Sequence, residues 1–112
     1  MIEIILQNKY SILLINIYGP NRDCPVFYEN IFNVIDKFTG DFVILGGDFN
    51  LIQDATLDYS NYTNINNPNA RNKLLSLVSE YDLIDPWRVH HNNTKKYTWH
   101  GPAHKQARLD FF

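Results

Sequence analysis

Runs of apolar residues along the chain predict several β-strands. Residues 2–6 and 11–18 are rich in β-branched and aromatic side chains, and the segment Gln7-Asn8-Lys9-Tyr10 separates them. Together the two runs predict a β-hairpin. Further along, four consecutive large apolar residues, Phe42-Val43-Ile44-Leu45, predict a strand over residues 42–47 that is covered on both faces.

Two segments show the apolar spacing of an amphipathic helix. The first begins near Pro25, and Thr39-Gly40-Asp41 ends it. Its predicted apolar face consists of Phe27, Ile31, Ile35 and Phe38. The second covers residues 70–81, with Asn69 as a candidate N-cap. Its predicted apolar face consists of Leu74, Leu75, Leu77, Val78 and Tyr81.

The remaining segments are short or polar. Residues 53–69 are crowded with Asn, Asp, Thr and Tyr, and they predict a long loop or a short irregular insert. Asp85-Pro86 predicts a turn after the second helix. Residues 97–99 and 107–112 predict two further strands with a Gly-Pro loop between them. Because strands and helices alternate, we expect a single mixed α/β domain over residues 1–112.

The composition is that of a small globular protein. The 112 residues are 45% apolar and 20% charged, which is sufficient for one hydrophobic core. No apolar run approaches the roughly 18 residues of a membrane-spanning helix, and Met1-Ile2-Glu3 does not begin a secretory signal. The single cysteine, Cys24, has no disulfide partner within the chain. We therefore expect an intracellular protein, nuclear or cytoplasmic and not secreted, without a membrane partner.

The charged residues are unevenly distributed, although the net charge is only −2. Residues 1–83 hold five basic and ten acidic side chains. Residues 84–112 hold five basic and two acidic side chains, together with all four histidines. Such a segment suits contact with phosphate groups. An ordinary solvated loop region would have the same composition.

The predicted strand over residues 42–47 leads into Gly46-Gly47-Asp48-Phe49-Asn50, a sequence that delivers polar side chains to a sheet edge. If the chain stays extended, Asp48 and Asn50 point to one side and Phe49 points into the core. A carboxylate can take a proton or hold a divalent cation, and a carboxamide can bind a phosphate oxygen or an attacking water. The alternative is that both residues cap a loop, because both residue types favour turns.

Other candidate residues lie near the ends of predicted strands. Asn16 and Tyr18 share one face of the second strand, and Asn21 follows on the next loop. A phenol and two amides suit phosphate oxygens, although Tyr18 is also a common strand residue. Asp110 lies within an apolar run, where an acid is costly unless it is paired or bound to a metal. Thr98 is the weakest candidate, since threonine is also a plain strand former.

Five motifs resemble, in their order and spacing, the endonuclease/exonuclease/phosphatase superfamily. They are Asn16-Ile17-Tyr18-Gly19-Pro20-Asn21, Leu45-Gly46-Gly47-Asp48-Phe49-Asn50, Asp85-Pro86-Trp87-Arg88, Tyr97-Thr98-Trp99 and Arg108-Leu109-Asp110. Within the superfamily, they are most similar to the endonuclease domain of LINE-type retrotransposon reverse-transcriptase polyproteins. The resemblance implies a four-layered α/β sandwich of the deoxyribonuclease-like kind, with two mixed sheets face to face and helices outside. It also implies DNA as the partner and magnesium-dependent cleavage of a phosphoester.

The resemblance further implies a role for each matching residue. Asp48 would position or deprotonate the attacking water, and Asn50 would bind that water or the scissile phosphate. These two residues are also the implied ligands of Mg²⁺. Tyr18 and Asn21 would bind the phosphate, and Asp110 would orient the catalytic histidine of the family. The implied substrate contacts are Asn16, Asn21, Thr98 and Arg108.

Two elements of the family have no counterpart here: a metal-binding glutamate that precedes the first motif and a catalytic histidine that follows the last one. Glu3 is too close to Ser11 to be that glutamate, and His100 and His104 lie upstream of Asp110 instead of downstream. We therefore expect a partial domain, a remnant of a retroelement endonuclease with little or no activity as this chain. A partial sandwich would leave apolar sheet surface uncovered, which favours self-association.

Two other functions remain open. One is a different phosphoesterase chemistry of the same superfamily, such as that of an apurinic-site endonuclease, an inositol-phosphate phosphatase, a sphingomyelinase or an RNA deadenylase. The residues around Asp85-Pro86-Trp87-Arg88 and Tyr97-Thr98-Trp99 favour the retroelement branch. The other is a non-catalytic role, either weak nucleic-acid binding through residues 84–112 or no molecular role.

Overall fold

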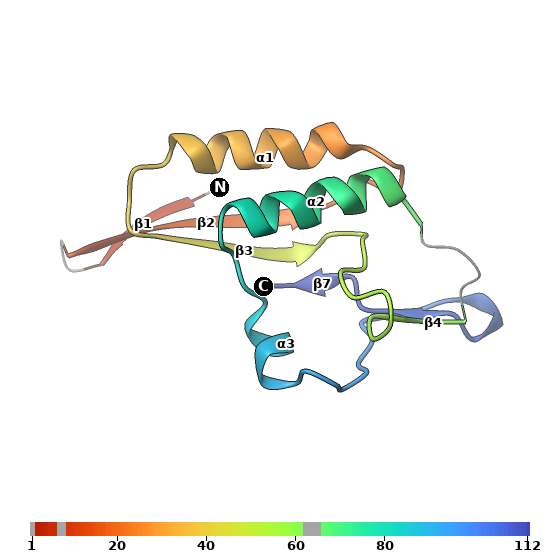
Figure 1. Cartoon of the computed structure of the whole chain (residues 1–112). Coiled ribbons are helices and arrows are strands. Elements are labelled where there is room, and N and C mark those ends of the chain that lie inside the picture. Colours follow the sequence, from red (N-terminus) through yellow and green to blue (C-terminus); the bar gives the residue numbers. More distant parts are fainter. Residues whose placement is uncertain (1, 7–8, 62–65) are drawn as a thin grey trace.

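The chain folds around a four-stranded mixed sheet with two long helices on one face (Figure 1). The computed structural model describes residues 2–6, 9–61 and 66–112. β1 (Ile2–Leu6) pairs antiparallel with β2 (Tyr10–Tyr18), which confirms the hairpin; its turn at Gln7-Asn8 lies outside the described residues. β2 pairs in parallel with β3 (Phe42–Asp48), and β3 pairs antiparallel with β7 (Asp110–Phe111). The expected mixed α/β class is thus confirmed.

The first helix, α1 (Pro25–Lys37), connects the two parallel strands, as a parallel pair requires. Its buried residues are Tyr28, Phe32 and Ile35. The predicted apolar face is therefore offset, because Phe27 and Ile31 are only partly buried at its flank. Phe38 is not helical, since it forms the C-cap with an extended conformation. The sequence does not show that the Tyr28 hydroxyl can form a hydrogen bond inside the protein. The predicted apolar face therefore included Phe27 and not Tyr28.

The second helix, α2 (Pro68–Glu80), lies beside α1 on the same face of the sheet (Figure 1). It starts after Asn67, so Asn69 is inside the helix and is not its N-cap. The carboxylate of Asp23, from the β2–α1 loop, accepts hydrogen bonds from the backbone N–H groups of Asn69 (3.2 Å) and Ala70 (2.6 Å). A negative charge satisfies the free N–H groups of a helix start and complements the helix dipole. The cap therefore comes from a residue 46 positions away in sequence.

Only one face of the main sheet is covered by the helices. The side chains of Leu13, Ile15 and Leu45 are buried in the core beneath α1 and α2. On the opposite face Phe42 is 53% exposed and Ile44 is 46% exposed. The prediction that β3 is covered on both faces is therefore wrong for the described residues. The uncovered apolar surface that was expected of a partial sandwich is present on this face.

A small second sheet lies beyond the end of β3 (Figure 1). Its strand order is β4 (Tyr59–Ser60), β6 (Gln106–Ala107) and β5 (Trp99–His100), and all pairs are antiparallel. The strand predicted over residues 107–112 is broken, because β6 and β7 belong to different sheets and Arg108-Leu109 crosses between them. The predicted loop over residues 53–69 contains β4, and its residues 62–65 lie outside the described part of the chain.

Two short helices complete the structure. α3 (Pro86–His90) starts at the predicted turn, and the Asp85 side chain caps it by accepting a hydrogen bond from the Arg88 backbone N–H. A single 3₁₀ turn, η1 (Pro102–His104), joins β5 to β6. Within the described residues, no helix is long and apolar enough to cross a membrane.

Candidate active site

Three candidate residues lie side by side across the main sheet. Tyr18 of β2 is in register with Asp48 of β3, and Asp48 is in register with Asp110 of β7. Register partners in adjacent strands point to the same face of a sheet. That face is the uncovered one, since Tyr18 is 76% exposed whereas its neighbour Ile17 is buried. We call Tyr18, Asp48 and Asp110 the polar row.

Asn16 extends the polar row along β2. It lies two residues before Tyr18, so both side chains are on the same face, and both are exposed. Its register partner on β3 is Gly46, and the ring of Phe112 occupies the space that a side chain at Gly46 would fill. The amide of Asn16 therefore lies on the same open surface as the polar row, as the sequence predicted.

Hydrogen bonds fix the strand ends that carry the polar row. The Gly19 backbone N–H donates to the Asp48 carbonyl (2.7 Å), and the Phe49 N–H donates to the Leu109 carbonyl (2.8 Å). The buried Tyr28 hydroxyl donates to the Phe49 carbonyl (2.5 Å). A Cβ at Gly19 would lie only 2.3 Å from the Phe49 oxygen, so this close approach requires glycine. The ends of β2, β3 and β7 are thus held together by the backbone itself.

The position of the Tyr28 hydroxyl raises its pKa. Burial raises the pKa of Tyr28 well above its ordinary value, and the negative charge of Asp48 raises it further. The phenol therefore stays protonated at neutral pH and keeps its hydrogen bond to the Phe49 carbonyl.

The backbone does not stay extended between Asp48 and Asn50. β3 ends at Asp48, and Asn50 has a left-handed backbone conformation with φ of 52°. The Asn50 backbone N–H donates to Asp48 Oδ1 (2.9 Å), and Asn50 Nδ2 donates to the Gly19 carbonyl. The loop-capping alternative therefore describes part of the role of both residues. Asp48 Oδ2 receives no hydrogen bond from the described residues, so it is available to a ligand.

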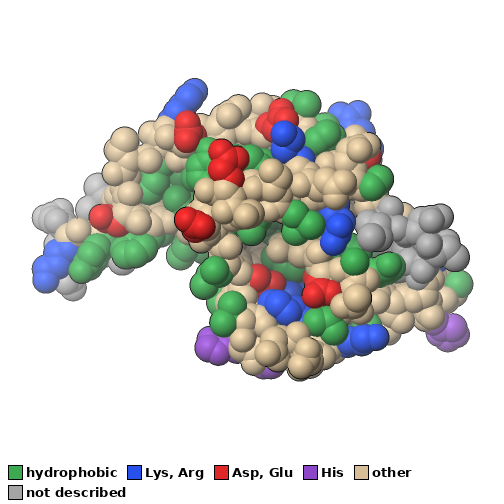
Figure 2. All heavy atoms as spheres, viewed as in Figure 1, with side chains coloured by type: hydrophobic (Ala, Val, Ile, Leu, Met, Phe, Trp, Pro, Cys, Tyr) green, Lys and Arg blue, Asp and Glu red, His purple; other side chains and the backbone are tan. Residues whose placement is uncertain are grey.

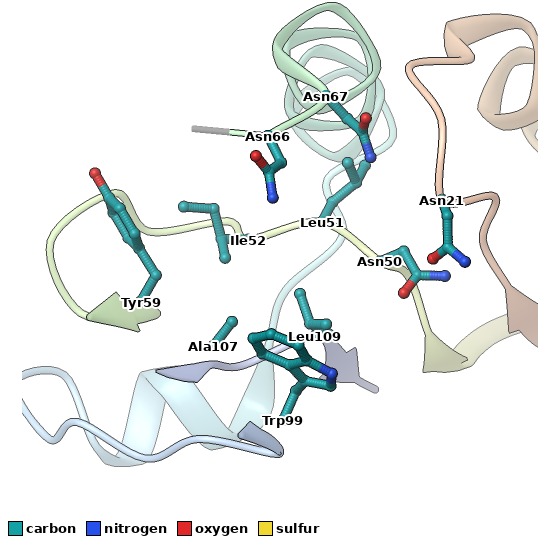
Figure 3. Close-up of a pocket in the computed structure, with 10 residues that line it drawn as sticks. All are labelled: Asn21, Asn50, Leu51, Ile52, Tyr59, Asn66, Asn67, Trp99, Ala107 and Leu109. Carbon is teal, nitrogen blue, oxygen red and sulfur yellow. The ribbon is translucent and has the colours of Figure 1, made fainter. Parts of the chain in front are cut away.

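Asn50 and Asn21 instead meet in a cavity beside the polar row. The cavity has a volume of about 460 Å³. Figure 3 shows the two amides next to each other, with the ring of Trp99 below them and Asn66 and Asn67 across the cavity. The described residues that line it are Asn21, Asn50, Leu51, Ile52, Tyr59, Asn66, Asn67, Trp99, Ala107 and Leu109. Apart from the phenol of Tyr59, these residues have no ionisable side chain, so their polar contacts come mainly from amides.

Thr98 supports Asp110 directly. Its hydroxyl accepts hydrogen bonds from the backbone N–H groups of Leu109 (3.1 Å) and Asp110 (3.4 Å). This contact fixes the start of β7 from the second sheet. Asp110 itself is exposed, so the expectation of an acid buried in an apolar strand is wrong. The expectation failed because the apolar neighbours of Asp110 face the other side of a short edge strand.

Arg108, an expected substrate contact, is placed in the interior. It is only 5% exposed, and its Nη2 pairs with Asp85 Oδ2 at 2.7 Å. Its guanidinium also lies 4.7 Å from the ring centre of Trp87 and 4.4 Å from that of Phe111. The guanidinium of Arg108 thus contacts two aromatic rings and forms an ion pair with Asp85. In this structure Arg108 therefore stabilises the fold.

Sequence reasoning missed the residue at the centre of this ionic cluster. Asp58 is 1% exposed, and its Oδ1 accepts a hydrogen bond from Arg88 Nη2 and lies 3.8 Å from Arg108 Nη1. Its Oδ2 accepts from the Asp54 N–H (2.8 Å) and the Gln53 N–H (3.3 Å). Asp58 lies in the polar run that predicted a loop, and no local signal separates it from its neighbours. Its partners Arg108, which is buried, and Arg88, which is mostly buried, explain why a buried acid is tolerated here.

Three side chains near the end of β3 carry oxygen atoms that fit a magnesium ion. Asp48 and Asp110 present two carboxylates on one open face, and Asn50 donates through Nδ2 to the Gly19 carbonyl, which leaves its Oδ1 as an acceptor. Mg²⁺ is commonly held by one or two carboxylates, with water and substrate phosphate as its other ligands. The described residues contain no group of three or more His, Cys, Asp or Glu side chains that could hold a metal ion.

Two of the five basic residues of the C-terminal segment, Arg88 and Arg108, are engaged in ion pairs with Asp58 and Asp85. Lys95 and Lys96 are exposed on the connection between α3 and β5. On the face that Figure 2 shows, Lys and Arg side chains are scattered and do not form one patch. Electrostatic attraction of a polyanion to this face is therefore weak.

In a comparison with models of known protein families, the chain matches none.

Proposed function

We propose that the chain carries a phosphoester-cleaving centre of the endonuclease/exonuclease/phosphatase type, related to the DNA endonucleases of LINE-type retrotransposons. The observation that supports this most is the polar row, in which a phenol and two carboxylates from three adjacent strands share one open face. Asp48 and Asp110 come from two separate sequence motifs, 62 positions apart. Their direct opposition across a strand pair is what the proposed site requires.

The cost of the arrangement also supports a functional role. Two like charges directly opposite each other on neighbouring strands destabilise a sheet. The structure gives neither Asp48 nor Asp110 a basic partner among the described residues. Pairs of this kind are retained where a cation or substrate group is bound between them. The four-layered sandwich fold belongs to the same proposal, with the uncovered face of the main sheet as the place of the second half.

Each residue of the site then has a chemical task. Asp48 Oδ2 accepts the proton of an attacking water or orients that water. The Tyr18 hydroxyl and the Asn16 amide donate hydrogen bonds to phosphate oxygens, and Asn21 does so from the neighbouring cavity. Thr98 holds the backbone of Asp110 in place. Magnesium bound by Asp48 and Asp110 would neutralise the charge that develops on the phosphoryl oxygens.

The proposed site is incomplete within the described residues. No hydrogen bond joins a histidine to Asp48 or Asp110 there, although the proposed relatives use a histidine at this point. We therefore expect the 112-residue chain to bind phosphate weakly and to cleave DNA poorly or not at all. The proposed function is best tested in a protein that supplies the histidine and the glutamate of the proposed relatives.

A chimera provides that test. Residues 11–112 would replace the corresponding segment of a complete retroelement endonuclease, and nicking of supercoiled plasmid would be measured with magnesium. The proposal predicts nicking that falls by at least about 100-fold in both the Asp48→Asn and the Asp110→Asn chimeras, since each loses a group that acts on the reacting phosphate. Glu80→Gln, which changes an exposed acid on α2, is the matched control.

Two results would reject the proposal. One is a folded chimera without nicking activity, and the other is activity that survives both aspartate substitutions. Inositol phosphates and polyadenylate offered to the same chimera would separate DNA cleavage from the other phosphoesterase chemistries. Preferential cleavage of one of these compounds would support the phosphoester-cleaving centre but would replace DNA as its proposed substrate.

A further inference from the structure

The peptide group between Phe49 and Asn50 takes part in two hydrogen bonds at once. Its carbonyl oxygen, on Phe49, accepts from the buried Tyr28 hydroxyl at 2.5 Å. Its N–H, on Asn50, donates to Asp48 Oδ1 at 2.9 Å. A trans peptide group is planar, so its C=O and N–H point in opposite directions and turn together. The bond to Tyr28 therefore also sets the direction in which the N–H meets the Asp48 carboxylate.

This orientation of the peptide needs support, because the backbone of Asn50 is in an uncommon conformation. Its φ of 52° lies in the left-handed region, which is unfavourable for residues with a side chain, although less so for asparagine than for most. Turning the Phe49–Asn50 peptide over would return Asn50 to a negative φ and would swing its N–H away from Asp48. Two contacts oppose this turn. They are the Tyr28 hydroxyl on the Phe49 carbonyl and the Gly19 carbonyl on the Asn50 side chain.

The environment of Tyr28 keeps its hydroxyl available as a donor. The residue lies on α1 and is 1% exposed, and its ring packs edge-on against Phe27 with the ring centres 5.1 Å apart. Burial raises the pKa of Tyr28, and the negative charge of Asp48 raises it further, so the hydroxyl stays protonated at neutral pH. Phenylalanine would fill nearly the same space, so the polar contact is what distinguishes tyrosine here.

The two hydrogen bonds of the peptide also strengthen each other. A donor on a peptide carbonyl polarises the amide group and makes its N–H a better donor. A continuous chain of hydrogen bonds thus runs from the Tyr28 hydroxyl in the core, through one peptide, to the Asp48 carboxylate on the open face of the main sheet. This chain holds Oδ1 of the carboxylate and leaves Oδ2 for a ligand.

We propose that Tyr28 is a positioning residue for the site at the end of β3, and that its hydroxyl orients the Asp48 carboxylate through the Phe49–Asn50 peptide. Tyr28 does not touch the reacting groups, since it is buried beneath the sheet whereas Asp48 shares the open face with Tyr18. The expected effect on cleavage rests on the proposed function. The orientation of Asp48 is a property of the chain itself and is measured separately.

Tyr28→Phe removes the hydroxyl, keeps the ring and tests the proposal by NMR on the 112-residue chain. The Asn50 amide proton should move upfield and exchange with deuterium about three- to tenfold faster, because its hydrogen bond to Asp48 is weakened. The side-chain carboxyl carbon of Asp48 should shift as well. That of Glu80, an exposed acid on α2, should not.

Ile35→Val is the matched control. It removes one buried methyl group from the same helix and destabilises the fold to a similar degree, but Ile35 cannot form a hydrogen bond with the Phe49–Asn50 peptide. The control should leave the resonances of Asn50 and Asp48 unchanged. Incorporating 4-aminophenylalanine at position 28 restores an N–H donor on the ring and should return the Asn50 amide proton towards its original shift.

The chimera described above measures the consequence for cleavage. Tyr28→Phe should lower kcat about three- to tenfold and change KM little, because Asp48 acts on the reacting water and not on the binding of DNA. Ile35→Val should change neither constant. A chimera without any activity would reject the proposed function, and the NMR comparison would still decide the role of Tyr28.

Three results would overturn the proposal. The first is that the resonances of Asn50 and Asp48 do not change in Tyr28→Phe, and the second is that they change equally in Ile35→Val. The third is an active chimera in which Tyr28→Phe alters KM but not kcat.

Discussion

Asp110 is the residue at which stability and function are expected to conflict. It lies directly across from Asp48, and no basic side chain among the described residues offsets either charge. Asp110→Asn removes the repulsion and should raise the free energy of unfolding by about 0.2–1 kcal/mol, the usual range for a cross-strand pair. Urea unfolding at low salt measures the change.

The effect of Asp110→Asn should fade with added salt, because exposed charges are screened. Glu80→Gln, which changes an exposed acid on α2, serves as the comparison. An Asp110→Asn variant less stable than the unmodified chain would show that the carboxylate has a structural role that the contacts do not reveal.

Tyr28 predicts how the fold responds to alkaline pH. Its pKa in the folded protein is raised, first by burial and then by Asp48, above the ordinary value of 10.0. Because folding favours the protonated phenol, the stabilisation is fully present below about pH 10 and is lost as the pH rises above that value. Thermal unfolding between pH 8 and 11.5 should show a falling melting temperature.

In Tyr28→Phe this alkaline decline should be shallower. The variant should also be less stable at neutral pH by about 1 kcal/mol, since the hydrogen bond to the Phe49 carbonyl is lost. Tyr10→Phe, which removes an exposed phenol, is the control. An alkaline decline as steep in Tyr28→Phe as in the unmodified chain would contradict the explanation.

At the scale of elements, the ionic cluster ties α3 to the β4–β6 strand pair. Asp58 precedes β4, Arg88 belongs to α3, and Arg108 begins the crossover from β6 to β7. Asp58→Asn leaves the mostly buried Arg88 guanidinium without its acid, whereas Arg108 keeps Asp85, and the loss costs about 3–5 kcal/mol. A small domain has about 5–15 kcal/mol in total, so a large share of its stability is lost. Urea unfolding followed by circular dichroism measures this.

A surface ion pair provides the matched comparison. Glu29 and Lys73 join α1 to α2 at 2.9 Å, and both side chains are largely solvated. Glu29→Gln should cost at most about 1 kcal/mol. If the two substitutions cost the same, the buried cluster is not what holds the second sheet against the main one.

The elements that sequence could predict are those with a simple period. The apolar spacing of α1 and α2 is visible in the residues, as are the β-branched and aromatic side chains of β2, whereas β3 was predicted from consecutive apolar residues. The break between β6 and β7 was not predictable, because the apolar run continues through Arg108 and Leu109 while the chain changes sheets. The cap of α2 by Asp23 and the burial of Asp58 also escaped prediction, because each depends on a partner far away in sequence.

The sequence predicted which residues form the candidate site better than it predicted how they are arranged. Tyr18, Asp48 and Asp110 were chosen from motifs, and strand register brings them together. Asn50 has a left-handed backbone and donates to the Gly19 carbonyl, and Arg108 is buried because two acids and two rings surround it. Neither outcome can be read from residue type or spacing alone.

At the scale of the whole molecule, charge limits any contact with DNA. The net charge is −2, and the basic side chains on the face shown in Figure 2 are scattered. Lys95 and Lys96 are adjacent and exposed, so they are the best placed to meet a phosphate backbone. Replacing both by glutamine should reduce the slope of log affinity against log salt by about 2, since each contact releases roughly one counterion.

Fluorescence anisotropy with duplex DNA at several salt concentrations measures that slope. Lys37→Gln, on α1 and therefore away from the open face of the sheet, is expected to leave it unchanged. Equal slopes in all three proteins would mean that residues 84–112 do not form the DNA contact. Arg108 is unsuitable for this experiment, because its substitution would disturb the buried cluster.

The central claim is that the polar row is one binding site for a divalent cation and a phosphate group. The most direct measurement is an NMR titration of the 112-residue chain with Mg²⁺ and a short oligonucleotide, following the side-chain carboxyl carbons. The claim predicts that Asp48 and Asp110 shift together with one saturation curve, that Asp110→Asn abolishes the response at Asp48, and that Glu80 does not respond. Independent curves for Asp48 and Asp110, or shifts no larger than that of Glu80, would contradict it.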